Sequence, residues 1–156
     1  MKIAISCDHR GVHLHQALSD LVEENGHEIV PVAFSDGASC DYPDYAWAVG
    51  CAVAEGRADR GVLICGSGIG MSIAANKVRG VRAALAHDEI SAEVCRRHND
   101  ANVLCLSADM LGQKLIEKIV ELWLETEFEG GRHARRVAKI AAIEAGEDPA
   151  AIVASS

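Results

Sequence analysis

The sequence predicts an α/β fold built around a parallel sheet. Five short apolar runs alternate with segments whose apolar residues recur at helical spacing, and glycine, proline or polar residues separate them. A chain in which strands alternate with helices forms right-handed βαβ units, which give a parallel sheet covered by helices. The length of 156 residues suits one domain with a sizeable core. We therefore expect a single domain over residues 1–156.

These patterns predict the elements in chain order. Leu14, Leu18 and Val22 share one face of the first helix, which Gly26 ends. The strands are expected at residues 2–7, 27–33, 61–64, 81–86 and 102–106. The later helices are expected at residues 45–55, 73–77, 89–97, 110–127 and 132–146, before a tail at 147–156. His98 and Asn99 then fall in the loop before the fifth strand.

Composition limits the partners and the compartment. The chain has 15 basic and 23 acidic residues, and its net charge of −8 argues against nucleic acid and anionic membranes as partners. No apolar run approaches the ~20 residues of a membrane span. The chain enters a strand at once, so we expect no signal peptide. The six cysteines include no C-x-x-C pair, which disfavours zinc sites and redox dithiols, and free thiols in such a chain indicate the cytoplasm.

Residues 65–72 carry the strongest functional signal. They place the thiol of Cys65 at the carboxyl end of an expected strand, with three glycines before the next expected helix. Glycine lets backbone N–H groups approach a ligand closely, and N–H groups at a helix start attract an oxyanion and favour a thiolate. The alternative is a tight turn after a strand, with a cysteine that is simply buried. The glycines directly behind Cys65 favour the functional interpretation.

Other polar residues have both a functional and a structural interpretation. Asp8 and His9 follow the first strand, where they could bind a hydroxyl and an anion or simply cap a helix. His98 could pass protons near neutral pH, or it could only interact with the dipole of the helix before it. Arg132 and Arg136 lie near one face of the last helix, as an anion site or as a solvated basic face.

Histidine spacing gives only a weak metal signal. His9, His13 and His15 lie close in the sequence, but no acidic or thiol ligand accompanies them at a matching spacing. We therefore expect no metal site.

Five motifs are specific when they are taken together. They are Cys-Asp-His at 7–9, Asp-Tyr-Pro at 41–43, Cys-Gly-Ser-Gly-Ile-Gly-Met-Ser-Ile-Ala-Ala-Asn-Lys at 65–77, His-Asn-Asp-Ala-Asn-Val-Leu at 98–104, and Gly-Gly-Arg-His with a further Arg at 130–136. With these motifs the chain resembles the type B ribose-5-phosphate isomerases and related sugar-phosphate isomerases, including allose and galactose 6-phosphate isomerases. The resemblance covers residues 3–144 and implies a three-layer Rossmann-like fold with a five-stranded parallel sheet.

The resemblance also implies a reaction. The chain would interconvert ribose 5-phosphate and ribulose 5-phosphate through an enediolate, without a cofactor or metal. Cys65 matches the base that moves a proton between C1 and C2, and His98 matches the histidine that opens the sugar ring. The active site is implied to lie between two subunits of a homodimer, and whether such dimers pair into a dimer of dimers stays open. His98, Asn99 and the two arginines would come from the partner.

The remaining site residues are implied in the same way. Ser67 joins the catalytic residues, and the N–H groups of residues 66–70 would stabilise oxyanions on both carbons. The phosphate would be bound by His9, Arg132 and Arg136. The other implied contacts to the substrate are Asp8, Tyr42, Gly66, Gly68, Ile69, Gly70 and Asn99.

Two positions depart from the family pattern. Ser67 stands where many relatives have threonine, and it keeps the hydroxyl. Asp109 stands where relatives commonly carry an arginine that helps to bind phosphate. In such a pocket Asp109 would oppose the anion that Arg132 and Arg136 attract, or it would pair with one of them.

Three rival functions remain open from the residues. The first is the same chemistry on another aldose, such as allose 6-phosphate, a tetrose phosphate or an unphosphorylated sugar. The second is a hydrolase with Cys65 as nucleophile, which a trapped acyl intermediate would reveal. The third is a non-catalytic sugar or nucleotide binder, in which Cys65→Ala would leave ligand affinity and biological activity intact.

Overall fold

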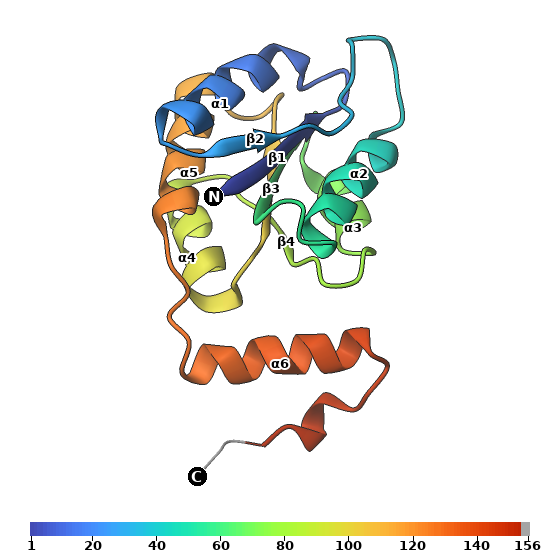
Figure 1. The fold of residues 1–156 in the computed structure, drawn as a ribbon, viewed down its shortest axis with the longest axis vertical. Helices are drawn as coiled ribbons and strands as arrows, with labels where there is room; N and C mark the ends of the chain where they lie inside the picture. The colour runs from blue at the N-terminus through green and yellow to red at the C-terminus, as the bar shows by residue number, and fades with distance from the viewer. Residues whose placement is uncertain (154–156) are drawn as a thin grey trace.

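Parallel pairing joins five strands into one sheet, in the order β2-β1-β3-β5-β4 (Figure 1). The computed structural model describes residues 1–153. The strands are β1 (Lys2–Cys7), β2 (Glu28–Val30), β3 (Arg60–Cys65), β4 (Ala83–Leu85) and β5 (Val103–Ser107). Every neighbouring pair is parallel, so the α/β class and the five-stranded parallel sheet predicted from the sequence are confirmed.

Helices cover both faces of the sheet and make three layers. The first face packs against α1 (Val12–Glu24), α4 (Glu89–Asn99) and α5 (Gln113–Glu125), and the second against α2 (Tyr42–Ala54) and α3 (Ile69–Ala75). Successive side chains of a strand point to opposite faces. Accordingly Val62 and Ile64 enter the first core, whereas Leu63 and Cys65 enter the second. The thiol of Cys65 therefore points to the α2 and α3 side.

The last helix, α6 (Arg132–Glu144), stands away from the sheet (Figure 1). It contacts α4, and among its residues only His133 and Ala142 are buried. Ile140 and Ile143 are 44% and 62% exposed, so α6 leaves apolar as well as basic side chains open. A short 3-10 turn, Pro149–Ala151, follows within the predicted tail, whose last residues, 154–156, lie outside the described part of the chain. None of the described helices is both long and apolar enough to span a membrane.

Two predicted strands are shorter in the structure. The strand expected at 27–33 ends at Val30, because Pro31 has no N–H to donate to the ladder. The strand expected at 81–86 is limited to Ala83–Leu85, at the other edge of the sheet. An apolar run predicts a strand from the character of its side chains alone. In the two edge strands the apolar run is longer than the segment whose backbone is paired.

Three helix boundaries also differ from the prediction in ways that affect the site. α2 begins at Tyr42 with Pro43 in its first turn, a position where proline fits a helix. α3 begins at Ile69, within the stretch expected as a loop, so Gly70 is helical. α4 continues to Asn99, so His98 lies in its last turn and not in a loop. The other elements differ only at their ends.

A buried arginine fixes the start of β3 against the end of α5. Arg60 is 6% exposed, and its Nη1 donates to the carbonyl oxygens of Trp123 and Leu124 at 2.9 and 3.0 Å. The guanidinium also lies 5.4 Å from the centre of the Trp123 ring. Burial and the nearby charge of Arg96 lower the pKa of Arg60 to about 10, so it stays charged at neutral pH.

We predict that Arg60→Ala lowers the free energy of unfolding by about 3 kcal/mol, because buried carbonyls at the end of α5 lose a charged donor. Urea denaturation followed by circular dichroism measures the change. The matched control is Arg57→Ala, since Arg57 is exposed and its ion pair within residues 1–153 is with Glu55. Equal losses in the two variants would contradict the anchoring role.

Candidate active site

Three strands end side by side and bring their following loops together. The register pairs Cys7 with Ile64 and Cys65 with Ser107, so β1, β3 and β5 finish at one edge of the sheet. The loops are tied there, because the Asp109 N–H donates to the Gly66 carbonyl at 3.0 Å. We call this side the carboxyl edge. Ligands of open parallel sheets bind at such an edge.

Cys65 is held close to the glycine loop that follows it. Its side chain is almost buried, at 4% exposure, and the Gly68 N–H donates to Sγ at 3.1 Å. Gly68 has φ 74°, and a Cβ there would lie 2.4 Å from Leu85 Cδ1 and 3.0 Å from the Leu106 carbonyl carbon. Only glycine therefore lets the loop approach the sulfur in this way.

The rest of the loop presents a hydroxyl and backbone donors. Ser67 Oγ accepts the N–H of Ile69 at 3.3 Å, which uses one of the donors predicted for the substrate. Gly70 lies in the first turn of α3, where N–H groups have no partner within the helix. A Cβ on Gly70 would lie 2.6 Å from Tyr42 Cζ, so the phenol ring packs directly on this loop.

Asp8 and His9 stand beside the loop with defined partners. Asp8 is buried, and its Oδ1 accepts the backbone N–H of Arg10 at 2.8 Å, which orders the turn after β1. Nδ1 of His9 accepts the backbone N–H of Cys40 at 3.4 Å. In a neutral ring the proton then lies on Nε2, which makes that nitrogen a donor.

The other predicted site residues lie at the opposite edge. α4 returns from the end of β4 to the start of β5, so its last residues, His98 and Asn99, lie where β5 begins. β5 itself spans about 13 Å from Val103 to Ser107. Arg132 and Arg136 belong to this amino edge, because α6 starts beside His98. The predicted site is thus divided within one chain into two groups, one at each edge.

A pair of arginines fixes the end of α4. Asp100 has φ 48°, an unusual conformation for a residue other than glycine. Its carboxylate accepts from Arg82 at 2.8 Å and from Arg96 at 2.9 Å, and Arg96 also donates to the Ala101 carbonyl. These contacts hold the turn after Asn99, so the position of His98 is well determined.

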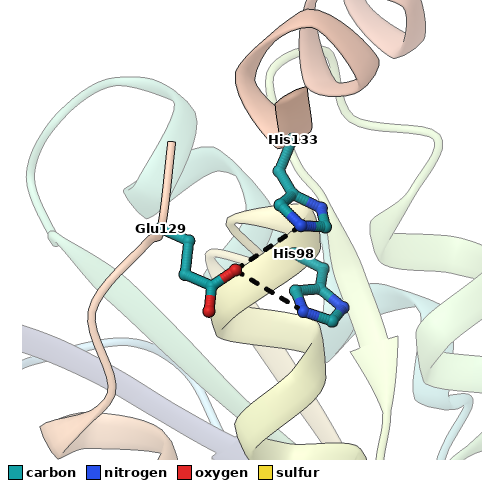
Figure 2. Close-up of side chains that lie close together, drawn as sticks. All are labelled: His98, Glu129 and His133. Carbon is teal, nitrogen blue, oxygen red and sulfur yellow. Dashed lines mark ion pairs between the residues drawn. The ribbon is translucent and has the colours of Figure 1, made fainter. Parts of the chain in front are cut away.

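Sequence reasoning missed two residues that surround His98. Its ring stacks on that of His133, with centroids 4.1 Å apart and planes within 4°. Figure 2 shows the carboxylate of Glu129 facing both rings, at 3.7 Å from His98 Nε2 and 3.5 Å from His133 Nε2. The spacing of four residues could have predicted the contact between Glu129 and His133. The contact of both residues with His98 depends on the tertiary fold and has no sequence signal.

The protonation of this cluster follows from its neighbours. Hydrogen bonds from Arg97 lower the pKa of Glu129, which stays ionised. Burial and then the charges of His98, Arg132 and Arg136 lower the pKa of His133, which is therefore neutral at pH 7. Arg132 Nε donates to His133 Nε2 at 3.3 Å, so this nitrogen of His133 serves as an acceptor. The ionised carboxylate of Glu129 thus lies beside both imidazole rings.

His98, Glu129 and His133 also form a group that could hold a metal ion, since one ligand atom from each lies within 4.8 Å of the others. A metal bound by an imidazole lies near the plane of the ring. Two parallel, stacked rings cannot both meet that condition for one ion. The stacked rings are therefore poorly oriented to coordinate one ion together.

Asp109 has a different partner from those expected. It does not pair with Arg132 or Arg136, which lie at the other edge of the sheet. Its carboxylate accepts from Arg10 instead, at 2.8 Å from Nη2. The sequence pattern did not predict this partner.

An α/β sheet with a cysteine and a glycine loop at its carboxyl edge suits proton transfer on a small polar substrate, and the comparisons with known proteins identify the family. The model of the Ribose/Galactose Isomerase family matches residues 3–140. The chain belongs to this family, as the motifs predicted.

Individual relatives match almost the whole chain. Ribose-5-phosphate isomerase B of Escherichia coli is 46% identical over 92% of this chain and 96% of its own length. D-erythrulose-4-phosphate isomerase of Pectobacterium atrosepticum is 40% identical over 90% and 93%. Among solved structures, ribose-5-phosphate isomerase B of Clostridium thermocellum has a TM-score of 0.91 at 46% identity, covering 94% of this chain and 99% of that one.

The thiols of this site and its surroundings differ in acidity. Burial raises the pKa of Cys7 and Cys95 to about 11 and also raises that of Cys105. Burial has the same tendency at Cys40, but hydrogen bonds with Ser35, His9 and Tyr45 outweigh it and lower the pKa.

We predict that iodoacetamide at pH 7.5 alkylates Cys40 well before Cys7, Cys95 or Cys105, because the thiolate is the reactive form. Peptide mapping by mass spectrometry measures each rate as a function of pH. In His9→Ala the midpoint for Cys40 should move to higher pH, since one of its hydrogen bonds is lost. A Cys40 midpoint at or above that of free cysteine would refute the contact with His9.

Proposed function

We propose that this protein is an aldose–ketose isomerase that interconverts ribose 5-phosphate and ribulose 5-phosphate through an enediolate. The observation that carries the proposal is the thiol of Cys65 against the Gly68 N–H, at the end of β3 and inside a glycine loop. Membership of the isomerase family and the relatives named ribose-5-phosphate isomerase B support the substrate. The six free thiols fit a cytoplasmic enzyme.

The chemistry needs one base that reaches two adjacent carbons. Cys65 removes the proton from C2 of the open aldose and returns it to C1, while the proton of the O2 hydroxyl is passed to O1 as the carbonyl moves from C1 to C2. Backbone N–H groups of the glycine loop and the hydroxyl of Ser67 stabilise the oxyanions that form on the two oxygens. In the structure the Gly68 N–H donates to Cys65 Sγ and the Ile69 N–H to Ser67 Oγ, so these two donors must exchange their partners for the substrate oxygens.

Ring opening and phosphate binding use the other group of residues. His98 offers a ring nitrogen to the sugar hydroxyl, and the ionised Glu129 carboxylate lies 3.7 Å from its Nε2. Arg132 and Arg136 are exposed cations on α6, and no acidic residue lies in the first turn of that helix. With the Nε2 donor of His9, they bind the phosphate.

These two groups meet only between subunits. A general acid or base must come within hydrogen-bond reach of the atom it serves, at about 2.6–3.2 Å. His98 and Cys65 lie at opposite ends of the sheet in one chain, so they cannot serve one pentose there. A homodimer with two-fold symmetry supplies the amino edge of one subunit to the carboxyl edge of the other. Two such sites form per dimer, and dimers of dimers remain compatible with this arrangement.

The principal rival is the same reaction on another sugar. The relative named D-erythrulose-4-phosphate isomerase supports a tetrose phosphate as the alternative substrate. A tetrose 4-phosphate cannot close a furanose ring, because its O4 carries the phosphate. An assay panel of aldose phosphates and free aldoses, read as ketose formation, separates these substrates.

We predict that Cys65→Ala reduces kcat on ribose 5-phosphate by roughly 10²–10⁴-fold or more, because the proton loses its acceptor. Calorimetry should show that the substrate still binds. Cys51→Ala is the matched control, since Cys51 is a half-buried thiol of α2 outside the predicted site. If Cys65→Ala retained near wild-type turnover, Cys65 would not be the base.

We also predict that mixing two inactive variants restores activity. In a mixed dimer of Cys65→Ala and His98→Ala subunits, one of the two sites receives both intact residues. Random exchange should therefore return about a quarter of the wild-type rate. The measurement is activity after mild unfolding and refolding of the mixture, with mass spectrometry to show exchange. Complete exchange without any recovery would mean that the sites are not shared.

A further inference from the structure

We propose that Arg10, oriented by Asp109, is an additional substrate-binding residue that contacts the anionic end of the substrate. The proposal rests on the proposed function, in which that end is a phosphate. It assigns a role to two residues that are far apart in the sequence and adjacent at the carboxyl edge.

The ion pair between Arg10 and Asp109 has a specific geometry. Arg10 Nε lies 3.2 Å from both carboxylate oxygens, and Nη2 lies 2.8 Å from Oδ1. Several contacts from one planar guanidinium to one carboxylate fix the orientation of its plane. The ammonium group of a lysine is a point charge and would not be oriented in this way. The side chain of Arg10 is therefore oriented before any ligand arrives.

The pair bridges two strand ends across the start of the glycine loop. Arg10 follows β1, where its N–H donates to Asp8, and Asp109 follows β5, where its N–H donates to the Gly66 carbonyl. A Cβ on Gly66 would lie 2.8 Å from Asp109 Oδ2 and 3.6 Å from Arg10 Cγ. The guanidinium is thus held directly beside the residue that follows Cys65, with His9 next to it in the chain.

Donors of Arg10 remain available after this pairing. Asp109 takes the Nε–H and one Nη2–H, so the Nη1 group and the second Nη2–H are left. The side chain of Arg10 is 56% exposed, which leaves these groups accessible. A phosphate accepts two such donors in parallel, and charge-assisted contacts of this kind are the strong ones.

The pairing also answers the problem that Asp109 poses. An isolated carboxylate beside the glycine loop would repel the substrate phosphate. Here the Asp109 carboxylate forms an ion pair with Arg10, and Arg10 still has N–H donors that do not contact Asp109. Asp109 therefore acts as the positioning residue, and Arg10 supplies the positive charge at this edge.

The competing interpretation is an ordinary surface ion pair, which contributes little to stability. The chain contains a matched example in Arg57 and Glu55, whose N–O distance is also 2.8 Å and whose side chains are 49% and 59% exposed. This second pair follows α2 and precedes β3, so it lies at the amino edge. It is an arginine–carboxylate pair of comparable exposure, but it lies away from the glycine loop.

The test compares Arg10→Gln with Arg57→Gln in the full-length protein. For Arg10→Gln we expect the Kd of inorganic phosphate, measured by calorimetry, and the KM of ribose 5-phosphate to rise about tenfold or more. The effect on kcat should be much smaller, because the phosphate end is remote from the reacting carbons. Arg57→Gln should bind phosphate as the wild type does. Equal phosphate affinity in the two variants would overturn the proposal.

A charge-exchanged double variant, Arg10→Asp with Asp109→Arg, provides the second measurement. In this variant the cation is Arg at position 109, after β5, and it lies close to the place that Arg10 occupies in the wild type. Phosphate affinity should therefore recover most of what Arg10→Gln loses. Circular dichroism confirms that each variant is folded. A folded double variant that binds phosphate as weakly as Arg10→Gln would count against the role of a cation at this position.

The two proposals fail in different ways. If the wild type does not isomerise ribose 5-phosphate but its phosphate affinity depends on Arg10, the proposed substrate is wrong and the anion site stands. If the wild type isomerises ribose 5-phosphate and Arg10→Gln keeps the phosphate affinity of the wild type, the inference fails and the proposed function stands.

Discussion

The parallel pairing of β3 with β1 and β5 decides how Cys65 and His98 lie relative to each other. Parallel strands all finish at one edge, and each crossover helix must run back to the other edge before the next strand can start. Cys65 ends a strand and His98 ends a crossover helix, so the sheet itself separates them. This separation is why the proposed function, which uses both residues, invokes a second copy of the chain.

Close packing is the second constraint, and it acts on the glycine loop. Gly68 fits between Leu85 and Leu106, and Gly70 lies under the ring of Tyr42. A side chain at either position would push the loop away from the Cys65 sulfur. The glycines thus serve the chemistry indirectly, because they let backbone donors lie where a larger residue would hold them off.

The sequence was sufficient for the α/β class, the parallel sheet and the location of the carboxyl-edge residues, whereas the strand order comes from the structure. Apolar runs of the right length mark buried strands, and their alternation with helices determines the direction of pairing. It misplaced the start of α3, because glycine is unfavourable in helices and Gly70 was assigned to a loop. It also missed Glu129 and Arg10, whose partners depend on tertiary contacts: Arg10 and Asp109 are 99 positions apart. Periodicity carries no information about such pairs.

Local pairing of charges explains how a chain of net charge −8 can still bind an anion. The overall field of the protein repels phosphate, and salt screens that field over about 8 Å. What matters is which carboxylates remain unpaired close to the ligand. Arg97 engages Glu129 beside His98, and Arg10 engages Asp109 beside Cys65. The carboxylates of Glu129 and Asp109, one at each edge of the sheet, are therefore paired with arginines. A phosphate near either edge meets cations whose neighbouring carboxylate is already neutralised, even though acidic residues outnumber basic ones in the whole chain.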